Sequence, residues 1–189
     1  MKPTVFLLLL FLPTLLSAQL KNRLSIGPRA GVNFSAVDRE NTEGATGLLL
    51  GLTSTYSLNE SSGITIDALY SSEGFEENGR TTDLALLRIP VLYNVFFGQL
   101  GENLRPKIYL GGAPGFLLKA EENGVEVENE YSNLVLDLAA GAGFNYRLAS
   151  RIWLNTDARL GLGLTSFKEN NDDYKNLTIQ ISLGVAYGL

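Results

Sequence analysis

The chain contains no cysteine and no histidine among its 189 residues. Without cysteine, no disulfide can stabilise the fold and no thiolate can serve as a nucleophile or metal ligand. Without histidine, serine–histidine and cysteine–histidine catalysis are excluded, and a zinc site is not expected. Since no other set of residues indicates a catalytic, metal or cofactor site, we expect a protein that is not an enzyme and needs no cofactor.

Positive charge is also scarce. The 15 lysines and arginines are outnumbered by 20 acidic residues, which gives a formal net charge of −5. A partner with a phosphate backbone would need a basic face, so nucleic acid is excluded as a partner.

Helical periodicity is missing as well. Beyond residue 18, apolar residues recur at every second position and not every 3.6, which predicts strands.

A long hydrophobic helix is likewise lacking. The longest apolar run, 5–16, is shorter than the ~20 residues that a membrane-spanning helix needs. Lys2 precedes this run and Ser17, Ala18 and Gln19 follow it. A charged start, a short apolar core and a small residue at its end predict a cleaved signal peptide over 1–18. The exported domain then covers 19–189.

Strand-like alternation fills this domain, and it is clearest in the last segment. Leu177, Ile179 and Ile181 alternate there with small or polar residues. Successive side chains of a strand point to opposite faces, so such a strand has one apolar and one polar face. Eight strands of this kind are predicted, over 23–34, 46–57, 63–71, 84–97, 105–118, 134–147, 151–165 and 177–189.

The connections between these strands alternate in length. Short turns over 58–62, 98–104 and 148–150 alternate with long, charged loops over 35–45, 72–83, 119–133 and 166–176. Short turns at one end and long loops at the other are typical of an outer-membrane barrel with an even number of strands. We therefore predict an all-β fold, an eight-stranded antiparallel transmembrane β-barrel in the cell outer membrane, with both termini at the periplasmic end.

Aromatic residues are predicted to mark the two membrane–water interfaces. Such girdles flank the apolar band of outer-membrane barrels. The residues expected at the short-turn end are Tyr56, Phe97, Tyr146 and Tyr187, and those expected at the long-loop end are Phe34, Tyr70, Phe116 and Phe167.

The polar faces of the strands carry full charges that must point into the lumen. An eight-stranded barrel is only wide enough for side chains to fill it, so these charges must pair with one another. We expect Asp137 to pair with Arg159, and Asp67 with Arg88, as inward residues of neighbouring strands. The expected lumen network consists of Arg29, Asp67, Arg88, Lys107, Asp137, Asp157 and Arg159.

Three short stretches carry a family resemblance. They are Leu-Arg-Ile-Pro-Val-Leu-Tyr at 87–93, Leu-Arg-Pro-Lys-Ile-Tyr-Leu-Gly-Gly at 104–112, and Leu-Gly-Val-Ala-Tyr at 183–187. Together they resemble the PorT-type small outer-membrane β-barrel family. The resemblance implies a porin-like fold in a Gram-negative envelope. It also implies outer-membrane lipid, lipopolysaccharide, periplasmic chaperones and the barrel-assembly machinery as partners.

The expected function is structural or interaction-based: envelope integrity, adhesion or a part in a secretion assembly. Most of the 20 acidic residues fall in the four long loops, which are the candidate surface for a protein partner. Two alternatives remain open. One is a periplasmic lipocalin-like binder of small ligands. The other is a barrel enzyme acting on lipid or peptide, which the absence of histidine counts against.

Overall fold

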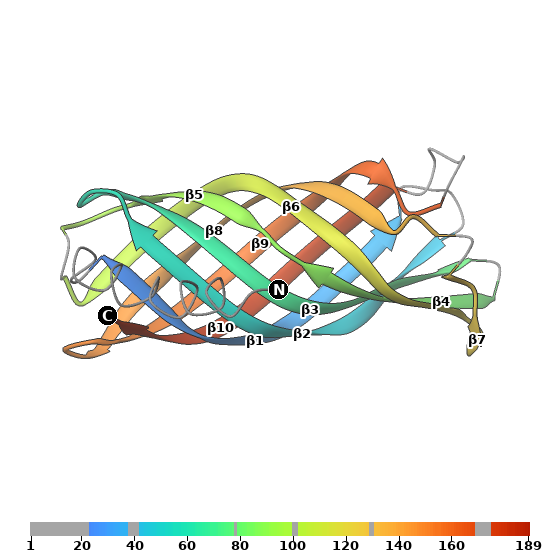
Figure 1. Cartoon of the computed structure of the whole chain (residues 1–189), viewed down its shortest axis with the longest axis horizontal. Coiled ribbons are helices and arrows are strands. Elements are labelled where there is room, and N and C mark those ends of the chain that lie inside the picture. The colour runs from blue at the N-terminus through green and yellow to red at the C-terminus, as the bar shows by residue number, and fades with distance from the viewer. Residues whose placement is uncertain (1–22, 38–41, 78, 100–101, 129–130, 169–174) are drawn as a thin grey trace, which may run out of the picture.

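The computed structural model describes residues 23–37, 42–77, 79–99, 102–128, 131–168 and 175–189. The predicted signal peptide over 1–18 lies outside the described residues. Within them, there is no helix of the length and apolar character that would let it cross a membrane. The described chain is built from antiparallel strands that wind around one long axis (Figure 1).

Ten strands form a single sheet that closes on itself, because the first strand pairs with the last. Eight of its positions make the ring, and the strands β4 and β5 share one of them. The strands are β1 (Leu24–Val37), β2 (Thr42–Ser57), β3 (Ser62–Glu77), β4 (Arg80–Arg88), β5 (Val91–Phe96), β6 (Leu104–Glu122), β7 (Val125–Glu126), β8 (Leu134–Ala149), β9 (Ile152–Ser166) and β10 (Lys175–Gly188).

The fourth predicted strand is divided into β4 and β5 at Ile89 and Pro90. Proline has no backbone N–H to donate to a ladder, so the regular pairing stops there. The wall itself continues, because the amide of Asp67 donates to the carbonyl of Pro90 at 3.1 Å and that of Ile89 to the carbonyl of Pro114 at 2.9 Å. The short strand β7 is not part of the ring and pairs only with the end of β6, with which it forms a hairpin.

The two ends of the barrel differ. We call the end that holds Leu24, Gly188, the turns at 58–61 and 150–151 and the described residues 97–99 and 102–103 the terminal end, and the opposite one the loop end. At the loop end, β1, β2, β3, β4 and β6 all run further than the alternation predicted. Glu77 and Arg80 lie directly opposite each other, so the expected loop over 72–83 is mostly a hairpin.

Exposure alternates along the strands with period two. In β10 every odd-numbered residue from Leu177 to Tyr187 is exposed, and Ile181 is 53% exposed. The even-numbered residues between them are buried in the lumen. The same pattern runs around the ring and leaves an outward band of leucine, isoleucine and valine. A soluble monomer does not expose an apolar surface of this extent, whereas lipid covers it.

Most of the predicted girdle residues face outward. Phe34, Tyr70, Phe97, Phe116, Tyr146 and Tyr187 are exposed, and Tyr56 is half-buried. The prediction for Phe167 is wrong, because this side chain is only 4% exposed and lies inside the barrel. The outward residues of β9 carry even numbers, as Leu160, Leu162 and Leu164 do, so an odd-numbered residue points inward.

Candidate functional site

The lumen holds a network of buried polar and charged side chains. Four cationic and four anionic side chains are buried there as ion pairs, so the paired filling is neutral as a whole, and one more buried cation among the described residues, Arg105, lies nearer the terminal end. Burial of a charge requires an opposite charge and hydrogen bonds. The paired residues are Arg29, Arg88, Lys107, Arg159, Asp67, Glu73, Asp137 and Asp157.

Five of these residues form a central cluster near the middle of the barrel. Arg159 contacts Asp67 at 2.7 Å, and Arg29 contacts Asp157 at 2.8 Å. Lys107 contacts the second oxygen of Asp157, also at 2.8 Å. Arg29 further lies 3.9 Å from Asp67 and so couples the two halves of the cluster.

Tyr109 supports the central cluster from one side. The cationic groups of Arg159 and Lys107 each lie 5.6 Å from the centre of its ring, within cation–π range. Its hydroxyl donates to the carbonyl of Ala158 at 3.2 Å. Gly141 makes room for this ring, because a side chain there would collide with the tyrosine hydroxyl.

A second cluster lies toward the loop end. Arg88 makes a bidentate contact with Glu73, at 2.6 and 2.9 Å, and a further contact with Asp137 at 2.9 Å. The amide of Asn176 donates to both carboxylates, at 3.0 Å to Glu73 and 2.9 Å to Asp137. The hydroxyl of Ser71 donates to Glu73 at 2.7 Å. This outer cluster carries one cation and two anions, and the central cluster carries the compensating excess of cations.

The two ion pairs predicted from the sequence are wrong, because Asp137 pairs with Arg88 and Asp67 pairs with Arg159. Asp137 lies opposite Gly163 on β9, whereas Arg159 lies opposite Gly141 on β8. The two are therefore four positions apart along the strand pair, about 13 Å at 3.3 Å per residue. Asp67 instead meets Arg159, although their strands β3 and β9 are not neighbours.

Glu73 is a lumen residue that was not predicted from the sequence, because it fell in the predicted loop over 72–83. Its position was still indicated by the alternation. It continues the inward series of Asp67, Leu69 and Ser71 on β3. Asn176 was missed for the same reason, at the edge of another predicted loop.

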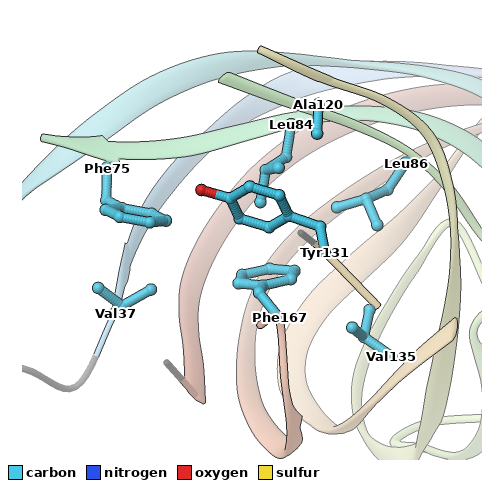
Figure 2. Close-up of a cluster of buried hydrophobic side chains, with 8 residues drawn as sticks. All are labelled: Val37, Phe75, Leu84, Leu86, Ala120, Tyr131, Val135 and Phe167. Carbon is cyan, nitrogen blue, oxygen red and sulfur yellow. The ribbon is translucent and has the colours of Figure 1, made fainter. Parts of the chain in front are cut away.

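An apolar plug closes the lumen beyond the outer cluster (Figure 2). Tyr131 and Phe167 lie at its centre, and the other labelled side chains surround them. Tyr131 is 3% exposed and Phe167 is 4% exposed. The plug consists of Val37, Phe75, Leu84, Leu86, Ala120, Tyr131, Val135 and Phe167.

Little free space remains between the plug and the central cluster. The cavity beside Arg88, Asp137 and Arg159 measures about 10 Å³, which is room for about one water molecule. Within the described residues, no three acidic side chains come together in a way that could hold a metal ion. Beside Arg88 and Asp137, the described part of the lumen is therefore filled by side chains.

The loop end carries a surface of exposed acidic residues on two hairpins. Glu76 and Asp83 lie on the β3–β4 hairpin, and Glu126 and Glu128 lie on or beside the β6–β7 hairpin, whose turn at 123–124 is followed by the 65% exposed Val125. Two cations of these hairpins pair with acidic residues, and one of them is Arg80, which lies 3.5 Å from Glu122. Lys119 contacts Glu121 at 2.8 Å, and this hydrogen bond raises the pKa of the lysine.

The comparisons with known proteins agree with this geometry. The family model of the outer membrane protein beta-barrel domain matches residues 17–169. This match does not distinguish the PorT-type branch from other members. A comparison with curated proteins finds no match.

Solved structures share the fold at low sequence identity. The chain is similar to the neisserial surface protein A, NspA, with a TM-score of 0.64 at 13% identity over 88% of this chain and 97% of that one. It is similar to the outer membrane protein OprG from Pseudomonas aeruginosa, with a TM-score of 0.57 at 15% identity over 89% and 97% of the two chains. A third similar structure is Ail, the attachment invasion locus protein of Yersinia pestis, with a TM-score of 0.51 at 18% identity over 87% and 99%.

Proposed function

Since this chain belongs to the outer membrane protein beta-barrel domain family, we propose that it works in the outer membrane as a closed, non-enzymatic barrel that acts through its loop end. The proposal includes cleavage of the signal peptide over 1–18, which exports the chain across the inner membrane. The outward apolar band then contacts outer-membrane lipid.

The filled lumen is the observation that carries this proposal. Two coupled charge clusters and an apolar plug lie one above the other along the barrel axis, with a cavity of only about 10 Å³ between them. A water file through this filling would have to separate buried ion pairs, which hold each other's charge in a medium of low dielectric constant. Conduction is therefore disfavoured.

The exterior argues against the lipocalin-like alternative. A lipocalin-like binder is polar outside and apolar inside, which is the reverse of the arrangement here. Leu48 and Leu183 are 59% and 57% exposed on the outside, whereas Asp67 and Arg159 are buried inside. The enzyme alternative has no supporting observation either, because the described residues hold no histidine or cysteine and no metal-binding group.

The loop end is the surface that we expect partners to contact. The described parts of the long-loop regions over 35–45, 72–83, 119–133 and 166–176 lie there. We place this end outside the cell because periplasmic turns are short in such barrels. Its acidic hairpins would repel anionic lipopolysaccharide and favour a cationic protein partner. Adhesion and envelope integrity fit this surface, and Ail, whose name refers to attachment and invasion, is similar in fold. A PorT-type role as a secretion-assembly partner belongs to the same proposal.

Planar-bilayer recording of the purified protein at high salt tests the closed lumen. We expect no reproducible unitary steps. The variant Arg88→Ala with Phe167→Ala, which removes parts of the outer cluster and the plug, should admit water and show small currents. Steps of porin size in the wild-type protein would contradict the closed lumen.

A pull-down from detergent-solubilised outer membranes tests the role of the loop end. The bait is the wild-type barrel, and the comparison is a variant with Glu121, Glu122 and Glu126 changed to glutamine. Loss of the same captured proteins from the variant is expected. Equal capture by both baits would show that the acidic hairpin is not the contact surface.

A further inference from the structure

We infer that the terminal end holds a binding site for a small anion with phosphate or carboxylate groups. A cavity of about 320 Å³ opens there, lined by residues at or beside the ends of β1, β2, β5, β6, β8, β9 and β10. This volume lies at the lower end of the range for small-molecule sites. We call this cavity the vestibule.

The vestibule is lined by four arginines and by no acidic residue. They are Arg23, Arg105, Arg147 and Arg151. Within the described chain, none of the four lies within salt-bridge distance of a carboxylate. The two acidic residues of the described turns at this end, Glu60 and Glu102, are exposed and do not line the vestibule. Glu102 and Glu60 attract Arg105 from outside the lining, but no lining carboxylate pairs with the four arginines, so an excess of cationic charge is left for a ligand.

The side-chain contacts of these arginines are all with neutral groups. Arg147 donates to the amide oxygen of Asn103 at 2.7 and 3.1 Å, and its guanidinium lies 6.0 Å from the ring centre of Trp153. Arg23 and Arg151 each donate one bond at 3.4 Å, to a carbonyl and to a tyrosine hydroxyl. These contacts hold the guanidinium groups in place without neutralising them.

Arg105 is the strongest indication of a ligand. The residue is only 4% exposed, and its guanidinium lies 4.6 Å above the ring of Phe96. One terminal nitrogen donates to the carbonyl of Glu60, but the buried Nε has no partner. A buried donor without an acceptor costs free energy, and a ligand oxygen would remove that cost.

Guanidinium groups select the class of ligand. The planar fork of arginine matches the paired oxygens of phosphate and carboxylate, and several forks around one cavity favour an anion with two or more charges. Serine, threonine and asparagine side chains supply further hydrogen-bonding groups in the lining. The anion could be free in solution or part of a lipid headgroup, and both present the same chemistry.

Titration of the folded protein in dodecyl maltoside, an uncharged detergent, tests this inference. Trp153 is the only tryptophan of the chain and lines the vestibule, so its fluorescence reports occupancy. Three probes are added at constant ionic strength: inorganic pyrophosphate, citrate and dihexanoylphosphatidic acid. A saturable change with either of the first two supports a site for a free anion. A change with the lipid alone supports the same site with a headgroup as its occupant.

Two variants make the test specific. Arg151→Gln, at an exposed position, should weaken binding about tenfold, as expected for one charge-assisted hydrogen bond. Arg80→Gln removes the same charge from the loop end and should leave binding unchanged. Equal weakening by both variants, or no saturable change up to about 10 mM of any probe, would overturn the inference. Neither result depends on whether the barrel conducts.

Discussion

Phe167 and Phe116 are the same residue type at the same end of the barrel, but they face opposite sides of its wall. Phe167 is 4% exposed in the plug, and Phe116 is 44% exposed toward lipid. We expect Phe167→Ala to lower the free energy of unfolding by about 3–5 kcal/mol, because it leaves a cavity between packed side chains. Phe116→Ala should cost clearly less, since lipid chains fill the space. Urea unfolding in lipid vesicles measures both, and equal losses would contradict the plug.

Asp67 holds the central cluster together, because both Arg159 and Arg29 contact it. Asp67→Asn should therefore destabilise the barrel by about 3–5 kcal/mol, since it leaves a buried cation without its partner. The matched control is Asp83→Asn, at an exposed position of β4, which should stay within about 0.5 kcal/mol.

A double variant distinguishes the pairing seen here from the one that the sequence predicted. Asp67→Leu combined with Arg159→Met removes both charges and should recover part of the loss, because no unpaired charge remains. Asp67→Leu combined with Arg88→Met should recover nothing. It leaves Arg159 without a carboxylate partner, and it also leaves the buried carboxylates of Glu73 and Asp137 without their cation. The opposite order of stabilities would show that Asp67 pairs with Arg88.

At the scale of the strands, alternation alone predicted which residues face lipid and which face the lumen. The inward positions of Asp67, Asp137 and Asp157 follow directly from period two. The pairing of these charges could not be predicted in the same way. It depends on the stagger between strands, which decides which side chains reach the same height of the lumen.

The strand ends at the loop end were also beyond prediction from composition. Charged residues such as Glu73 and Glu76 suggested a loop, yet they lie in β3. A hairpin that extends beyond the membrane can carry charges on both faces. Glu73 then points inward to Arg88, and Glu76 is exposed.

Neighbouring residues of β10 provide a direct test of the two faces. Ile181→Arg places a charge in the lipid-facing band and should cost about 2–4 kcal/mol near the bilayer midplane. Gln180→Leu, at a residue that is 7% exposed in the lumen, should be much milder. Folding yield into lipid vesicles measures the difference. If both variants fold equally poorly, the assignment of the faces is wrong.

At the scale of the whole molecule, the two ends carry opposite charge, with acidic hairpins at the loop end and arginines at the terminal end. The absence of cysteine makes the orientation easy to measure, because any introduced thiol is unique. Val125→Cys should react with a membrane-impermeant maleimide on intact cells, since we propose that the loop end faces outward. Ser150→Cys, exposed at the terminal end, should react only after permeabilisation. The reverse pattern would place the vestibule outside the cell.

The plug of Tyr131 and Phe167 has a thermodynamic consequence for the vestibule. A lumen that is sealed at one end exchanges solutes with a single compartment. Whatever enters the vestibule must leave through the same mouth, so its occupancy is set by the concentration on that side alone. No gradient across the outer membrane can drive net flux through such a barrel, and no work can be drawn from one. With the closed lumen and the anion site that we propose, the terminal end would store or report an anion but would not carry it across.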